Sequence, residues 1–237
     1  MPNVGFAIIA AGLGSRLKAE NVTQPKPMVC LGGEPMIGRL IGIMRGAGAD
    51  SVSVIVNTGN IRTAEYLKSN DFGLTTNLLV EDTPGSMHSL YRLYRMLESR
   101  QQTPDRLIVT TVDTVFRPSE FCRYVDAARL SDAHAFMGVT PFIDDEKPLY
   151  VGVAHDNSIT GFYDDRHGCS YVSAGVYGLT RKALSVLEQT VAAGETRMRA
   201  YQRAILSAGL TATAFNLGKV VDVDHIRDIE TAKSILE

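Results

Sequence analysis

The sequence predicts an α/β fold with a mostly parallel, helix-covered sheet. Short apolar runs alternate along the chain with amphipathic stretches, which is the pattern of strands connected by helices. A glycine-rich turn directly follows the first apolar run, at residues 12–14. The 237 residues are 45 % hydrophobic and 21 % charged, which are ordinary values for a globular protein. This composition excludes disorder, collagen-like repeats and a coiled coil.

The first half of the chain is expected to supply four buried strands, at residues 4–10, 52–56, 74–80 and 107–111. Between them, apolar residues recur at helical spacing over residues 36–44 and again over residues 87–97. Ser86 directly precedes the second stripe and would cap that helix at its N-terminus.

The second half changes character, because three further strands are predicted, at residues 133–139, 149–154 and 171–177. The turn-rich segment 155–158 separates two of them. Helical patterns return later, at residues 181–189 and 198–206 and from Ile226 onward. We therefore expect one α/β domain over residues 1–237, with an inserted sheet region in its middle.

Charge and cysteine content narrow the kinds of partner. The 24 Lys and Arg residues nearly balance the 26 Asp and Glu residues, so no basic surface is predicted for nucleic acid or an anionic membrane. The cysteines and histidines form no CxxC or H-x₃-H pattern, which argues against a zinc site. The first apolar run stops at Gly12 and lacks a basic leader, so neither a membrane span nor a signal peptide is expected. The expected location is cytoplasmic.

The most informative segment is the turn AAGLGSRL at residues 10–17. Such a turn lets backbone N–H groups approach a triphosphate without obstruction by side chains. It is not a dinucleotide-binding fingerprint, because Leu17 stands where a third glycine would be required. Taken alone, a plain strand-to-turn glycine pair explains it equally well. If the turn binds phosphate, the nucleotide contacts come from Ala10, Ala11, Gly12, Gly14 and Ser15.

Two cations near this turn favour phosphate binding. Arg16 lies in the turn, and Lys26 follows in the proline-flanked segment QPKPM at residues 24–28. Two fixed positive charges suit a polyphosphate, because they neutralise the charge that develops when a phosphorus atom is attacked. The alternative for Lys26 is an ordinary solvated lysine in a surface loop.

These segments, with GGEPMI at residues 32–37, resemble the signature of the nucleotidyltransferases that make nucleotide-activated sugars and alcohols. These are the sugar-1-phosphate nucleotidylyltransferases and the phosphocholine cytidylyltransferases. The resemblance implies a Rossmann-like, mostly parallel sheet flanked by helices, with a smaller inserted sheet region that binds the acceptor. Residues 1–130 would form the nucleotide-binding half and residues 131–237 the acceptor-binding half.

Nucleotidyl transfer requires a divalent ion, usually Mg²⁺, between carboxylates and phosphate oxygens. Asp113 follows a buried strand, at the edge where open α/β sheets bind ligands, and the resemblance implies that it is the first metal ligand. Asp222 and Asp224 would point to one face of a strand just before the last helix. The resemblance implies an acidic ligand in this late segment, and we expect Asp224 first and Asp222 second. Asp113 could instead be a turn residue, and Asp224 could also cap the last helix.

The resemblance also implies contacts to the nucleobase. Family members often contact the base at a strand-to-helix junction, which in this chain is the segment 78–90. The residues expected there are Glu81, Gly85 and Ser86.

Acceptor contacts are implied at two further places. Gly175 lies in SAGVY, which looks like the family's strand with a glycine against the acceptor. Many members have Glu-Lys near residue 165, and Arg166 could replace that lysine at the acceptor phosphate. Lys219 is a second candidate for this contact, and the sequence leaves both open.

The predicted function is a Mg²⁺-dependent nucleotidyltransferase that acts on an NTP and a small phosphorylated acceptor, such as a sugar-1-phosphate, an alditol phosphate or phosphocholine. Arg16 and Lys26 would stabilise charge while the acceptor phosphate attacks the α-phosphorus and pyrophosphate leaves. One alternative is a glycosyltransferase that uses nucleotide-sugars, although such enzymes usually carry Asp-x-Asp where Asp113 stands alone. Another is a non-catalytic nucleotide-sugar-binding protein, which would not need both cations.

Overall fold

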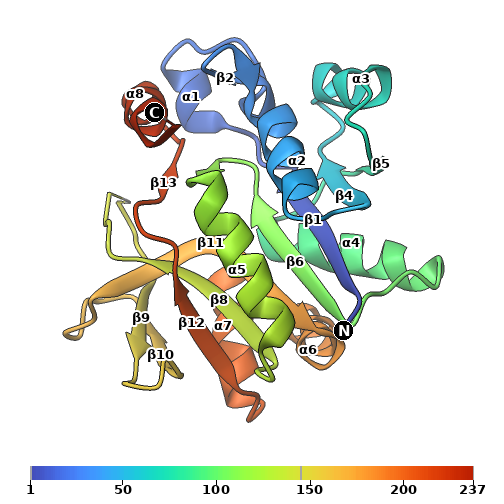
Figure 1. Ribbon diagram of the computed structural model, residues 1–237. Helices are drawn as coiled ribbons and strands as arrows, with labels where there is room; N and C mark the ends of the chain where they lie inside the picture. The colour runs from blue at the N-terminus through green and yellow to red at the C-terminus, as the bar shows by residue number, and fades with distance from the viewer. Residues whose placement is uncertain (1, 145, 237) are drawn as a thin grey trace.

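A nine-stranded sheet runs through the structure, a computed structural model that describes residues 2–144 and 146–236. Its central path has the strand order β10-β9-β11-β6-β1-β4-β5, and β8 and β12 extend it beside β11 (Figure 1). Both halves of the chain therefore contribute to one sheet. The fold is the predicted one, an α/β fold whose sheet is flanked by helices.

The first half forms the parallel part of this sheet. It consists of β1 (Val4–Ala10), β4 (Ser51–Val56), β5 (Thr75–Val80) and β6 (Arg106–Thr111). Strand β1 pairs in parallel with β4 on one side and β6 on the other. Its sequence VGFAIIA is apolar throughout because both of its faces are covered, as is typical of a central parallel strand. The four strands predicted here are confirmed.

The second half adds a mostly antiparallel region. Its strands are β8 (Ala135–Thr140), β9 (Tyr150–Val153), β10 (Ile159–Tyr163), β11 (Tyr171–Thr180) and β12 (Ala212–Asn216). The long strand β11 pairs antiparallel with β6, β8 and β9, and so joins the two regions. Strands β10 and β12 were not predicted: the turn at residues 155–158 leads into β10, and β12 pairs in parallel with β8.

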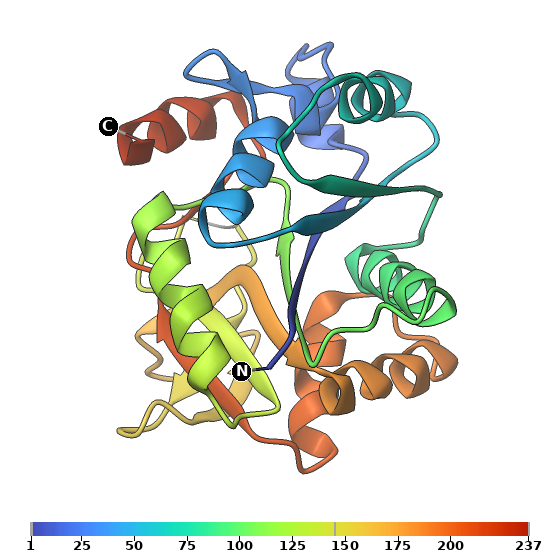
Figure 2. The ribbon, with the colours of Figure 1, turned by 45° about the vertical axis from the view of Figure 1, so that its right-hand side comes forward.

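Helices cover both faces of the sheet. They are α2 (Met36–Gly46), α3 (Ile61–Ser69), α4 (Ser86–Ser99), α5 (Pro118–Leu130), α6 (Arg181–Ala192) and α7 (Met198–Ser207). Figure 2 shows α2 and α5 on one side of the central strands and α4 and α6 on the other. Alternate residues of β1 face the two layers, with Ile8 toward α2 and Ile9 toward α4. Ser86 is the first residue of α4, and not its N-cap as predicted: Gly85 occupies that position.

A third apolar cluster lies above the sheet and joins short elements from distant parts of the chain. These are α1 (Ser15–Ala19), β2 (Cys30–Leu31), β7 (Thr114–Val115), β13 (Val221–Asp222) and α8 (Ile226–Leu236). Two further short elements are the 3₁₀ turn η1 (Lys26–Met28) and β3 (Glu34–Pro35), which pairs with β2. Leu17, Leu31, Val115, Val221 and Ile235 are all buried within this cluster. It holds the last helix beside α1 and β2, which come from the other end of the chain (Figure 1).

Within residues 2–144 and 146–236, no helix has both the length and the apolar character needed to cross a membrane.

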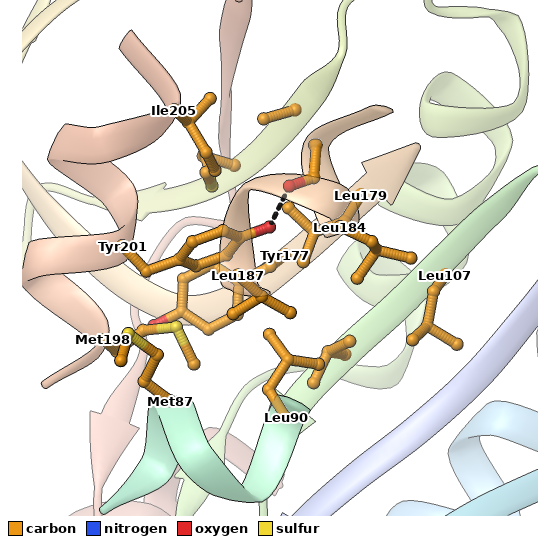
Figure 3. Close-up of a cluster of buried hydrophobic side chains, with 14 of the residues drawn as sticks. Met87, Leu90, Leu107, Tyr177, Leu179, Leu184, Leu187, Met198, Tyr201 and Ile205 are labelled. Carbon is orange, nitrogen blue, oxygen red and sulfur yellow. Dashed lines mark hydrogen bonds between the residues drawn. The ribbon is translucent and has the colours of Figure 1, made fainter. Parts of the chain in front are cut away.

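The core between α4, α6 and α7 gives a direct test of this packing. Leu90 is fully buried there among Leu107, Leu187 and Tyr201 (Figure 3). The hydroxyl of Tyr201 donates to the carbonyl of Ala183 at 2.9 Å. We expect Leu90→Ala to lower the free energy of unfolding by about 2–5 kcal/mol, because it removes buried methyl groups and leaves a cavity. Urea denaturation followed by circular dichroism measures this change.

The matched control is Leu130→Ala at the end of α5, where the leucine is 80 % exposed. That substitution should change the free energy of unfolding by about 0.5 kcal/mol or less. Equal losses in the two variants would contradict the described packing of α4.

Candidate functional site

Two clefts meet at the edge of the sheet where the parallel strands end. The first, of about 420 Å³, is lined by the glycine-rich turn, by Arg16 and Lys26, and by Asp113 and Asp224. The second, of about 640 Å³, is lined by β11 and the start of α7. They share the segment 84–86 together with Thr111 and Asp113. A molecule in one cleft could therefore react with a molecule in the other at Asp113.

The centre of the first cleft is the ammonium group of Lys26. It donates to the carboxylate of Asp113 and, at 2.6 Å, to that of Asp224. Arg16 donates to the other oxygen of Asp224 at 2.5 Å. The side chain of Lys26 is only 8 % exposed, whereas that of Arg16 is 45 % exposed at the cleft mouth. The four residues predicted as the catalytic cations and the first two metal ligands thus form one connected cluster.

The charge states of this cluster follow from its contacts. Burial alone would lower the pKa of Lys26, but the charges of Asp113 and Asp224 outweigh it and raise that pKa above its ordinary value. For Asp113, burial acts to raise the pKa, and the charge and hydrogen bond of Lys26 reverse this and lower it. Lys26 therefore stays protonated and Asp113 ionised at neutral pH.

Asp222 lies close to this cluster but has different partners. Its carboxylate accepts a hydrogen bond from Thr114 at 2.9 Å, and its side chain lines the second cleft. Desolvation inside the cleft and the negative charge of Asp113 raise the pKa of Asp222 to about 7. The strand ends at Asp222, so Asp222 and Asp224 do not form the predicted pair on one strand face.

The backbone fixes Asp224 beside Asp113. The amide of Val223, between the two late aspartates, donates to the carbonyl of Asp113 at 3.0 Å. The buried carboxylate of Asp228 accepts from the amides of Asp224 and His225 at 3.0 and 2.6 Å. Asp228 thus orients the peptide that carries Asp224.

The predicted capping role of Asp224 is taken by other residues. The amide of Ile226, at the start of α8, donates to Glu20 at 2.7 Å. Glu20 directly follows α1, so this contact ties the end of α1 to the start of the last helix. The carboxylate of Asp224 accepts hydrogen bonds from Arg16 and Lys26 and does not cap the helix.

The glycine-rich turn is braced from the neighbouring strand. Asn57, buried at the end of β4, donates its side-chain amide to the carbonyls of Ala11 and Gly12 at 3.0 and 3.2 Å. Asn57 was not among the predicted residues, although a polar residue directly after a buried strand is a signal for such a role. Of the residues predicted to bind the nucleotide, six line the first cleft: Ala11, Gly12, Gly14, Ser15, Gly85 and Ser86.

Two others lie elsewhere. Ala10 is buried within β1, where it contacts the apolar layer around α2. Glu81 forms an ion pair with Arg92 of α4 at 2.6 Å. From the same strand-to-helix junction, Thr83 lines the cleft beside Gly85 and Ser86, and its hydroxyl contacts that of the buried Ser89 at 2.6 Å.

On the acceptor side, only Gly175 of the three predicted residues lines the second cleft. Arg166 lies exposed in the turn between β10 and β11. Lys219 is also exposed, with its ammonium 4.8 Å from the centre of the Phe142 ring. The cations that line this cleft are Lys147, Arg197 and Arg199, none of which was predicted from the sequence.

The donor set of the joined clefts suits phosphate chemistry with a hard metal ion. Among the residues that the structure describes, no three His, Cys, Asp or Glu side chains are arranged to hold a metal ion by themselves. Asp113 and Asp224 both contact the same ammonium nitrogen and could approach one cation together. One or two carboxylates completed by phosphate oxygens and water is the coordination that Mg²⁺ prefers.

Comparison with known proteins gives a family match. The MobA-like NTP transferase domain matches residues 6–203. The chain is also similar to CMP-5'-(3-aminopropyl)phosphonate synthase of Streptomyces rubellomurinus, with 27 % identity over 165 residues, which are 69 % of this chain and 25 % of that protein. It is 25 % identical over 189 residues to mannose-1-phosphate guanyltransferase of Debaryomyces hansenii, covering 76 % of this chain and 51 % of the relative. The chain thus spans between a quarter and about half of these curated relatives.

A solved structure shares the fold. It is the inositol-1-phosphate CTP transferase from T. maritima, which superposes with a TM-score of 0.79 at 20 % identity. The superposition covers 98 % of this chain and 95 % of that one. The likeness extends over both regions of the sheet.

Gly175 provides a test of the cleft geometry. Its φ is +69°, and a Cβ at this position would lie 2.5 Å from the hydroxyl oxygen of Thr114 and 3.1 Å from that of Thr111. We expect Gly175→Ala to lower the free energy of unfolding by about 2–4 kcal/mol, because backbone strain and overlap with these hydroxyls add together. Thermal or urea unfolding measures the loss.

Gly168 is the matched control, because its φ of +73° is similar and nothing lies within 4 Å of a Cβ built there. Gly168→Ala should show the backbone strain alone, about 1–2 kcal/mol. If the two alanine variants are equally stable, β11 does not approach Thr114 as described.

Proposed function

This chain belongs to the MobA-like NTP transferase domain family, and from that premise we propose that it transfers a nucleotidyl group from an NTP to a phosphorylated acceptor with release of pyrophosphate. The observation that carries the proposal is the join of two clefts at Asp113, next to the cluster of Arg16, Lys26 and Asp224. The first cleft, with its glycine-rich turn, suits the triphosphate. The second is left for the acceptor.

The chemical step is an in-line displacement at the α-phosphorus. An oxygen of the acceptor phosphate forms a new bond to this phosphorus, and the bond to the oxygen that bridges to the β-phosphorus breaks. The electron pair of the broken bond leaves with pyrophosphate. A phosphomonoester has a second pKa of about 6, so the nucleophile is already ionised at neutral pH and no general base is needed.

The residues of the cluster stabilise charge and position the reactants. Lys26 is held protonated by Asp113 and Asp224, so its positive charge is present throughout the reaction. Arg16, at the mouth of the cleft, can pair with the β- and γ-phosphates through its planar guanidinium. Fixed charges of this kind act without reorganisation as negative charge shifts to pyrophosphate.

Mg²⁺ is the proposed cofactor, and Asp113 and Asp224 would hold it. The support is the pair of carboxylates that already converge on one cation, the ammonium of Lys26. When bound, the ion would neutralise phosphate charge as a Lewis acid. Asp222, at the second cleft, is a further oxygen donor close to Asp113.

The nucleobase and the acceptor are to be identified by a panel of NTPs and phosphorylated or phosphonate acceptors. Names of similar proteins support CTP with inositol 1-phosphate or 3-aminopropylphosphonate, and GTP with mannose 1-phosphate. Each NTP should be tested with each acceptor, with pyrophosphate release as the readout. A glycosyltransferase would release no pyrophosphate, and a non-catalytic protein would bind nucleotide without turnover.

We also propose a cytoplasmic location, which the three free cysteines support because thiols stay reduced there.

Removing the central cation should nearly abolish the reaction. We expect Lys26→Gln to lower kcat for pyrophosphate release by about 10²–10³, because a charge that stabilises the transition state is lost. Circular dichroism should show that the variant is folded. The matched control is Lys68→Gln on α3, where the lysine is exposed and outside both clefts. A Lys26→Gln enzyme with the kcat of the parent would refute the proposed role.

Removal of divalent ions tests the cofactor separately. Treatment with EDTA should abolish pyrophosphate release, and added Mg²⁺ should restore it. Asp224→Asn should need a higher Mg²⁺ concentration for half-maximal rate, because one charged ligand is lost. Asp126→Asn, on an exposed side chain of α5, should behave as the parent. Full activity in EDTA would exclude the proposed cofactor.

A further inference from the structure

The place where the two clefts join is bounded by a segment from the second half of the chain. Gly85 and Ser86 line both clefts, so they lie at the join. The carbonyl oxygen of Thr196 lies against Gly85, and a Cβ on Gly85 would be only 2.6 Å from it. Gly85 is therefore required by close packing. The contact holds the residue after Thr196, Arg197, beside the join.

The other cations of the acceptor cleft already have partners. Arg199 donates to Asp164 at 2.6 Å and to the carbonyl of Lys147 at 2.9 Å, which together fix its guanidinium. Asp164 is also paired with Arg203 at 2.8 Å. Lys147 also has an interaction partner.

Arg197 differs from these residues. Its side chain is exposed and lines the acceptor cleft. Within residues 2–144 and 146–236, its guanidinium forms no hydrogen bond or ion pair, although its backbone carbonyl accepts from the amide of Ala200 at 3.0 Å. An arginine placed without a carboxylate partner beside a cleft is suited to bind an anion that arrives with a ligand.

The acidic residues of the same cleft explain why such a cation is needed. Asp113 and Asp222 line the acceptor cleft, and the negative charge of Asp113 would repel a dianionic phosphate or phosphonate. The two cations that the sequence suggested for this role, Arg166 and Lys219, lie outside the cleft lining.

We propose that Arg197 is the residue that binds the phosphate or phosphonate group of the acceptor and holds it at the join of the two clefts. This inference rests on the proposed nucleotidyl transfer and deepens it. It assigns acceptor recognition to the turn between α6 and α7, and not to the turn between β10 and β11 where Arg166 lies. The guanidinium would form paired hydrogen bonds with two oxygens of the group, while the third remains available to attack.

The test compares kinetic constants for the acceptor of the panel above that the parent enzyme uses best. Arg197→Gln should raise the KM for that acceptor about tenfold to a hundredfold, because charge-assisted hydrogen bonds to it are lost. The KM for the NTP should stay within about twofold of the parent value. Arg197→Lys should recover part of the loss, since it restores the charge without the planar fork.

Comparison with other variants and with the parent enzyme makes the result decisive. Arg123→Gln, on the exposed surface of α5, is the matched control and should leave both KM values unchanged. An unchanged acceptor KM in Arg197→Gln would overturn the inference, as would a rise in Arg166→Gln or Lys219→Gln in its place. A parent enzyme that releases no pyrophosphate with any member of the panel would instead refute the proposed function, so the two failures are distinguishable.

Discussion

The ammonium of Lys26 lies between the carboxylates of Asp113 and Asp224, and the arrangement of the site depends on this contact. A lysine that is 8 % exposed is destabilising unless opposite charges surround it. The two carboxylates would likewise repel each other without the ammonium between them. The three groups are therefore stable only together. Each comes from a different element, so the contact also fixes η1, the end of β6 and the segment before α8 relative to one another.

The apolar cluster above the sheet makes this meeting possible. Leu17, Val115 and Val221 are buried in the same cluster, and each lies within a few residues of a charged member of the site. Burial of such side chains, worth about 1.5–3 kcal/mol each, can offset the desolvation of the charges nearby. Hydrogen bonds from Asn57 and to Asp228 then set the finer geometry of the glycine-rich turn and of Asp224. Packing brings the segments together, and polar contacts orient their functional groups.

The sequence was sufficient for the parallel strands and for the charged cluster. Arg16, Lys26 and Asp113 lie beside local sequence signals. These signals are a glycine turn, flanking prolines and a strand end, and they can be recognised without knowledge of long-range packing. Arg197 had no such signal, because its position depends on the packing of Thr196 against Gly85, more than 100 residues away in sequence. Strand β12 was missed for a similar reason: its short segment ATAFN becomes a strand by pairing with β8. Arg166 was expected from the family resemblance alone, and the structure places it in the exposed turn after β10, outside the lining of the second cleft.

The separation along the chain of the residues that meet at Lys26 has a consequence for folding. Asp224 lies 198 residues from Lys26 and 208 from Arg16, so these contacts close some of the longest loops in the molecule. Loop closure of this length is entropically unfavourable until intervening structure has formed. The parallel strands and their helices can therefore collapse first, with the charged groups still solvated and apart. Recovery of a functional site after dilution from denaturant would then trail the return of secondary structure, which makes the site a late reporter of complete folding.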